Sequence, residues 1–265
     1  MAGYTVYHER IESTHPALKR QVHHDSRSWD HRYDTTGLSI VSAVHERHIP
    51  ILNQGQVGAC TGNAGIGNLG TDPLYSPYCS AGLGRLSEHM SRTGMGGTLA
   101  AHLPYTLNES GALHLYSDAE TIDGDGPYPP NDNGSCGLSI AKSLVRRGAI
   151  GGYKHTFSLE DALKAFGKAP GMLGVSWFDD MFNPDPDGRL HITGPLKGGH
   201  EIECREIDAE HERIWIDNSW GAWGVNGRAY LTFDDFGSLL KQRGDVTILT
   251  PLTLPTPTPS VEVSA

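Results

Sequence analysis

Three segments of the sequence supply the side chains that a cysteine nucleophile requires. Cys60 stands in NQGQVGACTGNA, His200 in GGHEIEC and Asn218 in IDNSWGAWG. A free thiol with a pKa of about 8.5 is mostly protonated at neutral pH, so a cysteine nucleophile needs a neighbouring imidazole or a helix N-terminus. We therefore predict that Cys60 is a nucleophile and that His200 is its base.

Two amide side chains complete the predicted site. An imidazole that accepts the thiol proton and returns it to a leaving group must be held in one tautomer, and Asn218 fits this role. Attack on an amide carbonyl creates an oxyanion, to which the side chain of Gln54 and the backbone N–H of Cys60 can donate. Gly55 and Gly58 allow the loop before Cys60 to turn tightly and to bring its backbone close to a substrate.

The three segments resemble the motifs of the papain family of cysteine peptidases. Those motifs are a Gln-x-Gly-x-x-Gly-Ser/Ala-Cys-Trp block, a Gly-His-Ala block and an Asn-Ser-Trp-Gly-x-x-Trp-Gly block. The third block matches best: Asn218, Ser219, Trp220 and Gly221 stand in register, and Trp223 and Gly224 follow after one residue instead of two. The resemblance extends over roughly residues 45–240 of the chain.

The resemblance implies a peptidase that acts on a polypeptide substrate. Its catalytic residues would be Cys60, His200, Asn218 and Gln54. Trp220 would cover the histidine–asparagine hydrogen bond from water. Substrate binding is assigned to Gly58, Gly199 and Trp220, and the apolar walls of the cleft to Trp177, Met181 and Tyr75.

The chain departs from the family pattern near the nucleophile. Val57 replaces a cysteine that forms a disulfide in many members, and Thr61 replaces the tryptophan that usually follows the nucleophile. The segment GNAGIGNLG comes next, and each interior glycine destabilises a helix by about 1 kcal/mol relative to alanine. The helix that presents Cys60 is therefore expected to be short or held by packing. The family's long helical inhibitory propeptide is not visible ahead of Cys60.

Composition limits the classes of partner. The 265 residues suit one large domain or two subdomains that share a core. A net charge of −10 argues against nucleic acid or an anionic membrane surface as the main partner. The chain has no apolar run long enough to span a membrane and no apolar N-terminal signal segment, so we expect it to be cytoplasmic at synthesis. We also expect a monomer.

The remaining cysteines and the histidines do not predict a metal site or a cofactor. Free thiols are the default in a chain without an export signal, and they would be Cys79, Cys136 and Cys204. HERH at residues 45–48 lacks the spacing of a zinc site, and the pair His23 and His24 is interpreted as part of a solvated loop.

Two glycine-containing patterns are rejected as ligand sites. The GxGxxG string at residues 65–70 has no apolar strand before it and no acidic residue about twenty positions after it, which a dinucleotide fold requires. The segment DGDGPYPPNDNGS at residues 123–135 lacks the spacing of a calcium loop. It is interpreted as an ordinary surface loop.

Apolar spacing predicts a helical half followed by a β half. Helices are expected at residues 60–69, 80–91, 113–121 and 136–147, the last with Ser135 as a possible N-cap. A short helix should run from Ser158, as its N-cap, to Phe166. Strands are expected at residues 172–177, 201–208, 213–217 and 229–233.

These elements predict an α+β, papain-like fold of two subdomains with the active-site cleft between them. Residues 1–28 would form a loosely packed N-terminal extension, and residues 29–250 the peptidase domain. Within that domain we assign about 53–148 to the helical half and about 149–250 to an antiparallel, barrel-like half. Residues 251–265 are rich in proline and threonine and are expected to be disordered.

The sequence thus predicts a cysteine-type endopeptidase with a thiolate–imidazolium pair. Two alternatives stay open. The same chemistry could serve a hydrolase or acyltransferase that acts on peptidoglycan or isopeptide bonds. The chain could also be a non-catalytic binding protein on a peptidase scaffold.

Overall fold

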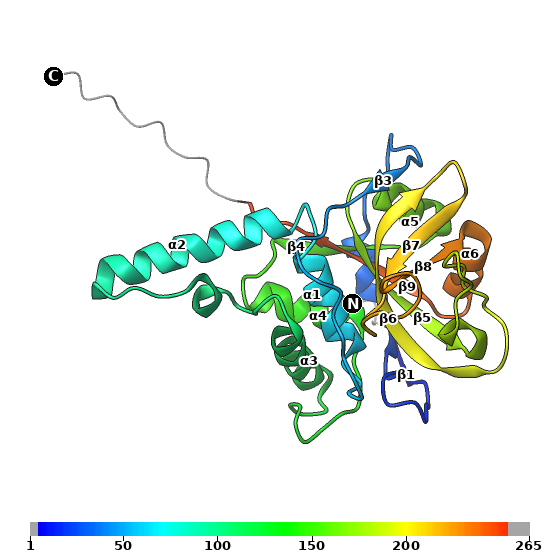
Figure 1. Cartoon of the computed structure of the whole chain (residues 1–265), viewed down its shortest axis with the longest axis horizontal. Helices are drawn as coiled ribbons and strands as arrows, with labels where there is room; N and C mark the ends of the chain where they lie inside the picture. Colours follow the sequence, from blue (N-terminus) through cyan, green and yellow to red (C-terminus); the bar gives the residue numbers. More distant parts are fainter. Residues whose placement is uncertain (1–4, 254–265) are drawn as a thin grey trace.

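Helices gather on one side of the molecule and an antiparallel sheet on the other (Figure 1). The computed structural model describes residues 5–253. The helical half comprises α1 (Cys60–Leu69), α2 (Tyr75–Thr93), η2 (Leu99–His102), α3 (Glu109–Asp123) and α4 (Gly137–Arg146). Helix α2 projects away from the body (Figure 1), and of its residues only Tyr78 and Gly82 are buried.

The β half is built on one sheet of seven strands. They are β3 (Ala43–Val44), β4 (Gly152–Thr156), β5 (Gly171–Phe178), β6 (Leu196–Asp208), β7 (Arg213–Asp217), β8 (Arg228–Thr232) and β9 (Asp245–Thr250). Two helices, α5 (Leu159–Phe166) and α6 (Phe233–Lys241), belong to this half, as does the short η3 (Asp179–Phe182). An N-terminal hairpin, β1 (Val6–Arg10) and β2 (Gln21–Asp25), forms a separate sheet and leads into η1 (Ser26–His31).

The sheet is open, so the prediction of a barrel-like half is wrong, whereas the α+β class is confirmed. Its strands run in the order β4-β9-β5-β6-β7-β8, and β3 pairs with β6. Within residues 5–253 the outer strands β4 and β8 do not pair with each other, as closure of a barrel would require. Phe166 of α5 and Phe236 of α6 instead pack against the apolar face of the sheet, which removes the need for closure.

Each half has its own apolar core. In the β half, Leu173, Val175 and Ile216 pack with the buried faces of α5 and α6. In the helical half, Ile66 of α1 and Leu115 of α3 lie in a second cluster, which also receives side chains from β5 and β9. The two cores explain why the chain folds as two packed halves.

Helix α1 is held by packing, as its glycine content predicted. All ten of its residues are buried. A Cβ atom at Gly62 would lie 2.2 Å from the carbonyl oxygen of Ala112 in α3, and one at Gly65 would lie 2.7 Å from the side chain of Ile140 in α4. The glycines therefore let two helices approach the helix that carries Cys60, and this packing compensates for their low helix propensity.

Helix capping explains which of the predicted helix starts are correct and which are not. Ser158 accepts a hydrogen bond from the backbone N–H of Asp161 (3.0 Å), so the predicted cap of α5 is confirmed. Helix α4 begins one residue later than expected, with Cys136 as its N-cap, because the Ser135 hydroxyl donates to Asp123 (2.6 Å) instead. Helix α3 begins earlier than predicted because Asn108 caps it.

The N-terminal segment is more tightly packed than predicted. Ala17, Leu18 and Arg20 are buried, so the expectation of a loosely packed extension is wrong for these residues. The division at residue 28 stays a prediction. The proposed disordered tail lies mostly outside the described residues, which end at 253.

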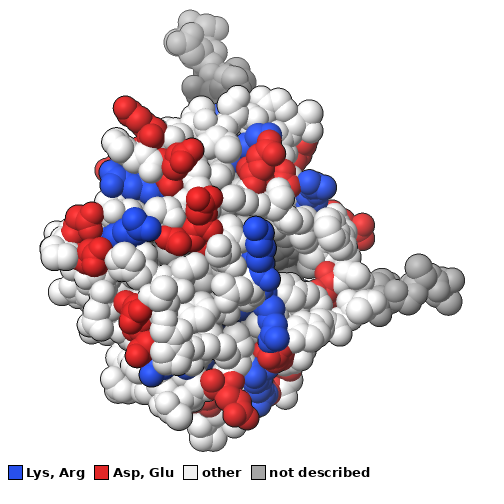
Figure 2. Space-filling view, turned by 90° about the vertical axis from the view of Figure 1, so that its right-hand side faces the viewer, with Lys and Arg blue, Asp and Glu red and all other residues white. Residues whose placement is uncertain are grey.

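Surface charges on the β half are mixed in sign. On the face turned to the viewer in Figure 2, basic side chains lie beside acidic ones with uncharged areas between them. Pairs of this kind in the β half include Arg228 with Glu206 (2.6 Å) and Arg213 with Asp208 (2.9 Å). All four cysteines are free thiols. Between residues 5 and 253, no helix has the length and apolarity of a membrane-crossing segment.

Replacing Gly62 with alanine is expected to destabilise the protein. The added methyl group would collide with the Ala112 carbonyl at 2.2 Å, so α1 and α3 must separate. Such overpacking typically costs about 1–3 kcal/mol of unfolding free energy. Gly84→Ala in α2 is the matched control, because a Cβ atom there meets nothing within 4 Å. Urea unfolding should show a loss for Gly62→Ala and no loss for Gly84→Ala; equal stability of the two variants would contradict this packing account.

Candidate active site

Cys60 occupies the N-terminus of α1 and is fully buried. The loop before it is tied to the β half by two backbone hydrogen bonds. Gln54 N–H donates to the Ser219 carbonyl (2.9 Å), and Gly221 N–H donates to the Leu52 carbonyl (3.1 Å). The nucleophile loop and the turn that carries Asn218 are therefore held together across the boundary of the two halves.

His200 and Asn218 lie on neighbouring strands and are hydrogen-bonded. His200 lies in β6, Asn218 follows β7, and the His200 Nε2 atom is 2.7 Å from Asn218 Oδ1. Asn218 Oδ1 also accepts a hydrogen bond from Ser219 N–H (2.8 Å), which identifies it as the acceptor. Nε2 must therefore carry the proton. The neutral ring then has Nδ1 unprotonated, as a base for a thiol requires, and Nδ1 has no hydrogen-bond partner.

Two tryptophans enclose the His200 ring. Trp220 stacks on it with centroids 4.7 Å apart, and Trp177 approaches it edge-on at 4.8 Å. Trp220 thus lies where it can shield the bond between His200 and Asn218 from water. Trp177 and Met181 are fully buried, so the prediction that they form walls accessible to a substrate is wrong in this state. Tyr75 stacks on His48.

A buried charge cluster fixes the strand end before Asn218. Asp217 accepts hydrogen bonds from the guanidinium groups of Arg205 (2.7 Å) and Arg228 (2.9 Å), and Arg47 lies 3.5 Å away. Charge-assisted bonds of this kind are stronger than neutral ones. They hold the end of β7, and the position of Asn218 follows from it.

The amide of Gln54 is held by three hydrogen bonds. Its Oε1 atom accepts a hydrogen bond from the Ser219 hydroxyl (2.6 Å), and its Nε2 donates to the Val57 carbonyl (2.8 Å). The second Nε2 hydrogen is donated to the carbonyl oxygen of Ala17 (3.1 Å). The amide that was predicted to stabilise an oxyanion therefore already binds a peptide carbonyl.

That carbonyl belongs to residues 13–21, which we call the strap. Lys19 forms an isolated parallel bridge with Gly199, and Arg20 N–H donates to the Gly199 carbonyl (3.0 Å). On the opposite side, Lys19 Nζ binds the Asp132 carboxylate (2.8 Å). The strap thus contacts both halves.

Both glycines assigned to substrate binding touch the strap. A Cβ atom at Gly199 would lie 2.3 Å from the Arg20 carbonyl oxygen, and one at Gly58 would lie 2.4 Å from the Lys19 side chain. Neither position leaves space for a larger residue while the strap is in place. The structure therefore places Gln54, Gly58 and Gly199 against a segment of the same chain.

Burial keeps Cys60 and His200 neutral while the strap is in place. Burial raises the pKa of the Cys60 thiol to about 12 and lowers the pKa of His200 to about 4. The N-terminus of α1 favours a thiolate by only about 1 kcal/mol. The desolvation of the Cys60 thiol outweighs the contribution of the helix N-terminus, because each unit by which a pKa rises corresponds to about 1.4 kcal/mol. An ion pair of thiolate and imidazolium therefore requires that the strap move away.

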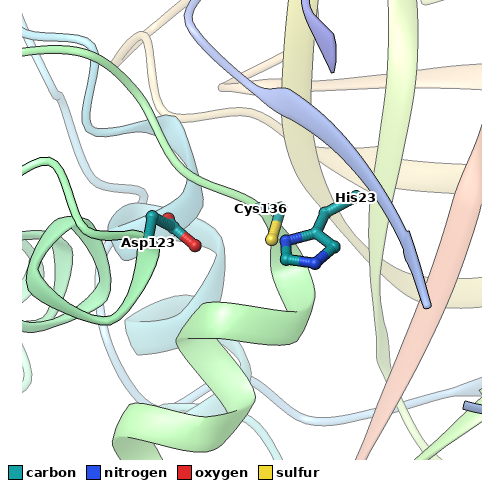
Figure 3. A group of neighbouring side chains, drawn as sticks. All are labelled: His23, Asp123 and Cys136. Carbon is teal, nitrogen blue, oxygen red and sulfur yellow. The ribbon is translucent and has the colours of Figure 1, made fainter. Parts of the chain in front are cut away.

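A possible metal site lies at the other end of the strap. His23 of β2, Asp123 at the end of α3 and Cys136 before α4 place one ligand atom each within 4.8 Å of one another. Figure 3 shows the Cys136 sulfur beside a nitrogen of the His23 ring, with the Asp123 carboxylate pointing toward both. The residues are far apart in sequence, so no spacing motif could reveal them.

Sequence reasoning missed the strap and its partner Asp132. The segment at residues 123–135 was interpreted as an ordinary surface loop, yet Asp132 accepts hydrogen bonds from Gly58 N–H (3.0 Å) and from Tyr116 (2.8 Å) besides holding Lys19. The only available signal was the run of apolar and basic residues at 17–20, which is too short to predict burial.

The fold is similar to that of solved cysteine proteases. Xylellain, a cysteine protease from Xylella fastidiosa, aligns with a TM-score of 0.62 and 16% sequence identity over 94% of this chain and 100% of that chain. Digestive procathepsin L 3 of Tenebrio molitor larval midgut aligns with a TM-score of 0.52 and 12% identity over 91% of this chain and 76% of that chain. No family model and no curated protein matches the sequence. The comparisons establish the papain-like fold that the sequence predicted.

We expect acid to displace the strap. The covered His200 has a pKa of about 4, against an ordinary value of 6.5, because burial disfavours its charged form. Between these two values the ring gains a proton only when it is uncovered, so the uncovered fraction should rise about tenfold between pH 7.5 and 5.5. His15 of the strap packs beside Trp220, and burial lowers its pKa as well, which acts in the same direction.

Hydrogen exchange of residues 13–21, corrected for the intrinsic effect of pH, measures this shift. The His200→Gln variant serves as the control and should lose most of the pH response. Protection that stays constant or rises on acidification would contradict the account.

Proposed function

We propose that the chain is a papain-like cysteine endopeptidase. The observation that carries the proposal is the hydrogen bond from His200 Nε2 to Asn218, because it leaves Nδ1 as a proton acceptor for a thiol at the start of a helix. A polypeptide substrate is supported by the strap. An extended peptide already pairs with Gly199 and places a carbonyl on Gln54.

The proposed reaction begins when the strap leaves the cleft. The Cys60 thiol gives its proton to His200 Nδ1, and the thiolate attacks the carbonyl carbon of the scissile bond. Gln54 Nε2 and the Cys60 backbone N–H donate to the resulting oxyanion. His200 then protonates the leaving amine, so that the C–N bond breaks and a thioester remains.

Water completes the cycle. His200 removes a proton from a water molecule, which attacks the thioester and releases the carboxylic acid and the thiolate. Asn218 keeps the ring in the required tautomer in both steps. Trp220 keeps water away from the bond that Asn218 makes.

The proposal predicts a graded series of losses. Cys60→Ala should reduce hydrolysis of unfolded casein to the background rate, because no other group supplies the nucleophile. Gln54→Ala should lower kcat by roughly a hundredfold through loss of an oxyanion donor. Asn218→Ala should lower kcat and leave measurable activity, since the ring keeps some productive orientation without it.

Cys79→Ala is the control in this series, because Cys79 is a free thiol on α2, outside the site. It should behave like the unchanged protein. Wild-type hydrolysis by Cys60→Ala would refute the assignment, and an unchanged protein without activity at pH 5.5 would favour a non-catalytic binding role.

A further inference from the structure

We infer that His23, Asp123 and Cys136 bind a zinc ion that fastens one end of the strap to the helical half. These residues come from β2, from the end of α3 and from the residue before α4. One ligand atom of each lies within 4.8 Å of the other two. The site lies outside the proposed catalytic residues and does not depend on the peptidase function.

The three donor atoms are a nitrogen, an oxygen and a sulfur, which together select zinc. Proteins bind zinc with imidazole, carboxylate and thiolate groups, whereas Mg²⁺ and Ca²⁺ prefer oxygen ligands alone. A thiolate and a carboxylate also carry two negative charges, which balance the two positive charges of the ion. Such a neutral cluster avoids the free-energy cost of burying an unpaired charge.

The three side chains converge on one point. Figure 3 shows a nitrogen of the His23 ring beside the Cys136 sulfur, and the Asp123 carboxylate points toward both from the other side. Bonds of about 2.0–2.3 Å to a tetrahedral zinc ion place its ligand atoms about 3.3–3.6 Å apart. The ligand atoms must therefore approach one another by about 1 Å from their present spacing of at most 4.8 Å.

Two of the three ligands lack partners that such groups normally have. His23 Nδ1 is buried and has no hydrogen-bond partner. Buried polar atoms are nearly always hydrogen-bonded, so an unpaired ring nitrogen requires an explanation. The Asp123 carboxylate accepts hydrogen bonds from two hydroxyl groups, but no arginine or lysine within residues 5–253 forms an ion pair with it. A cation between the ring and the carboxylate would satisfy both groups.

Two serines orient the carboxylate. The hydroxyl of Ser135 donates to Asp123 Oδ2 (2.6 Å), and that of Ser139 donates to Asp123 Oδ1 (2.5 Å). The Cys136 sulfur lies 3.4 Å from the Ser139 hydroxyl, so it belongs to the same network. Metal ligands are usually oriented by hydrogen bonds of this kind from a second layer of residues.

A cavity gives an ion access to the site. Its volume is about 420 Å³, and its lining includes His23, Cys136 and the exposed Trp29. It has room for a water molecule, which would complete a tetrahedral site as the fourth ligand. Binding would release one proton from the Cys136 thiol, and the hydrated ion would lose water molecules in exchange for the three side chains.

The site would strengthen an existing connection between the strap and the helical half. Gln21, where the strap meets β2, donates from its backbone N–H to the Ser135 carbonyl (2.7 Å) and from its side chain to the Gly134 carbonyl (2.8 Å). His23 follows Gln21 by two residues, and Cys136 follows Ser135 directly. A bound ion would therefore add a metal bridge beside these hydrogen bonds and hold β2 in place.

Cobalt titration of the full-length chain tests metal binding. The protein carries Cys60→Ala, so that Cys60 and His200 cannot bind the metal together, and no measurement here depends on catalysis. Co²⁺ should produce a thiolate-to-metal charge-transfer band that saturates at one ion per chain. Zn²⁺ should displace the band, whereas Mg²⁺ should not, because it does not compete for thiolate ligands. Absence of the band, or its displacement by Mg²⁺, would overturn the inference.

Further substitutions in Cys60→Ala assign the ligands. Cys136→Ser should abolish the band because it removes the thiolate. His23→Gln and Asp123→Asn should each weaken cobalt binding at least tenfold, since even the loss of a second-layer partner costs about 10–100-fold in metal affinity. A band that persists in Cys136→Ser, or an affinity that neither of the other two substitutions changes, would refute the assignment.

Two controls match these substitutions. Cys79→Ser removes a thiol on α2. His48→Gln removes a histidine of the other group of three possible ligands, which consists of Glu46, His48 and Asp72 and contains no thiol. Both variants should keep the band and its affinity. Loss of the band in either control would mean that cobalt binds outside the proposed site.

Thermal unfolding separates the loss of a ligand from the loss of the fold. An ion that binds only the folded chain raises the thermal midpoint, by several degrees once its concentration is about a hundred times the dissociation constant. Relative to the same protein in EDTA, Zn²⁺ should cause this rise in Cys60→Ala and not in the chain that also carries Cys136→Ser. An equal rise in both would show that zinc binds elsewhere.

Hydrogen exchange tests whether the ion fastens the strap. Opening of β2 would break the bond from His23 to the ion, so it should become about tenfold rarer when free Zn²⁺ is about ten times the measured dissociation constant. Amides of residues 21–25 in Cys60→Ala should exchange about tenfold more slowly in Zn²⁺ than in EDTA. Addition of Cys136→Ser should remove the difference. Cobalt binding without slower exchange would refute the fastening of the strap.

Discussion

The hydrogen bond between His200 and Asn218 is the interaction on which the rest of the site depends. It joins two neighbouring strands and assigns the ring proton to Nε2, because Asn218 Oδ1 is fixed as an acceptor by Ser219 N–H. The neighbouring side chains stabilise this geometry. Three arginines hold the strand end at Asp217, and Trp177 and Trp220 exclude water from the ring.

The same site is covered by its own chain. The strap places a carbonyl on Gln54 and pairs with Gly199. Burial raises the pKa of the Cys60 thiol and lowers the pKa of His200, so both groups are neutral. Covering the site therefore requires no distortion of Cys60, His200 or Asn218. It requires only that a peptide with the right backbone path and one buried cation, Arg20, occupy the cleft.

The features that could be predicted from the sequence are those that depend on neighbouring residues in the chain. Glycine and tryptophan context selected the candidate site residues, which stay a prediction. The limits of α1 and the cap at Ser158 were correct because each depends on neighbours in the chain. The open edge of the sheet was missed because it depends on how α5 and α6 cover the strands. The strap was missed because its contacts join Arg20 to residues about 180 or more positions away, which no single-sequence pattern records.

The reactivity of Cys60 tests the central claim most directly, and Cys79 provides an internal comparison in the same molecule. The measurement is the rate at which an epoxide thiol reagent modifies each cysteine at pH 6 in Arg20→Ala, with and without His200→Ala. The account predicts that Cys60 reacts much faster than Cys79 and that this advantage disappears when His200 is removed. Equal rates for the two cysteines, or a Cys60 rate that does not depend on His200, would contradict it.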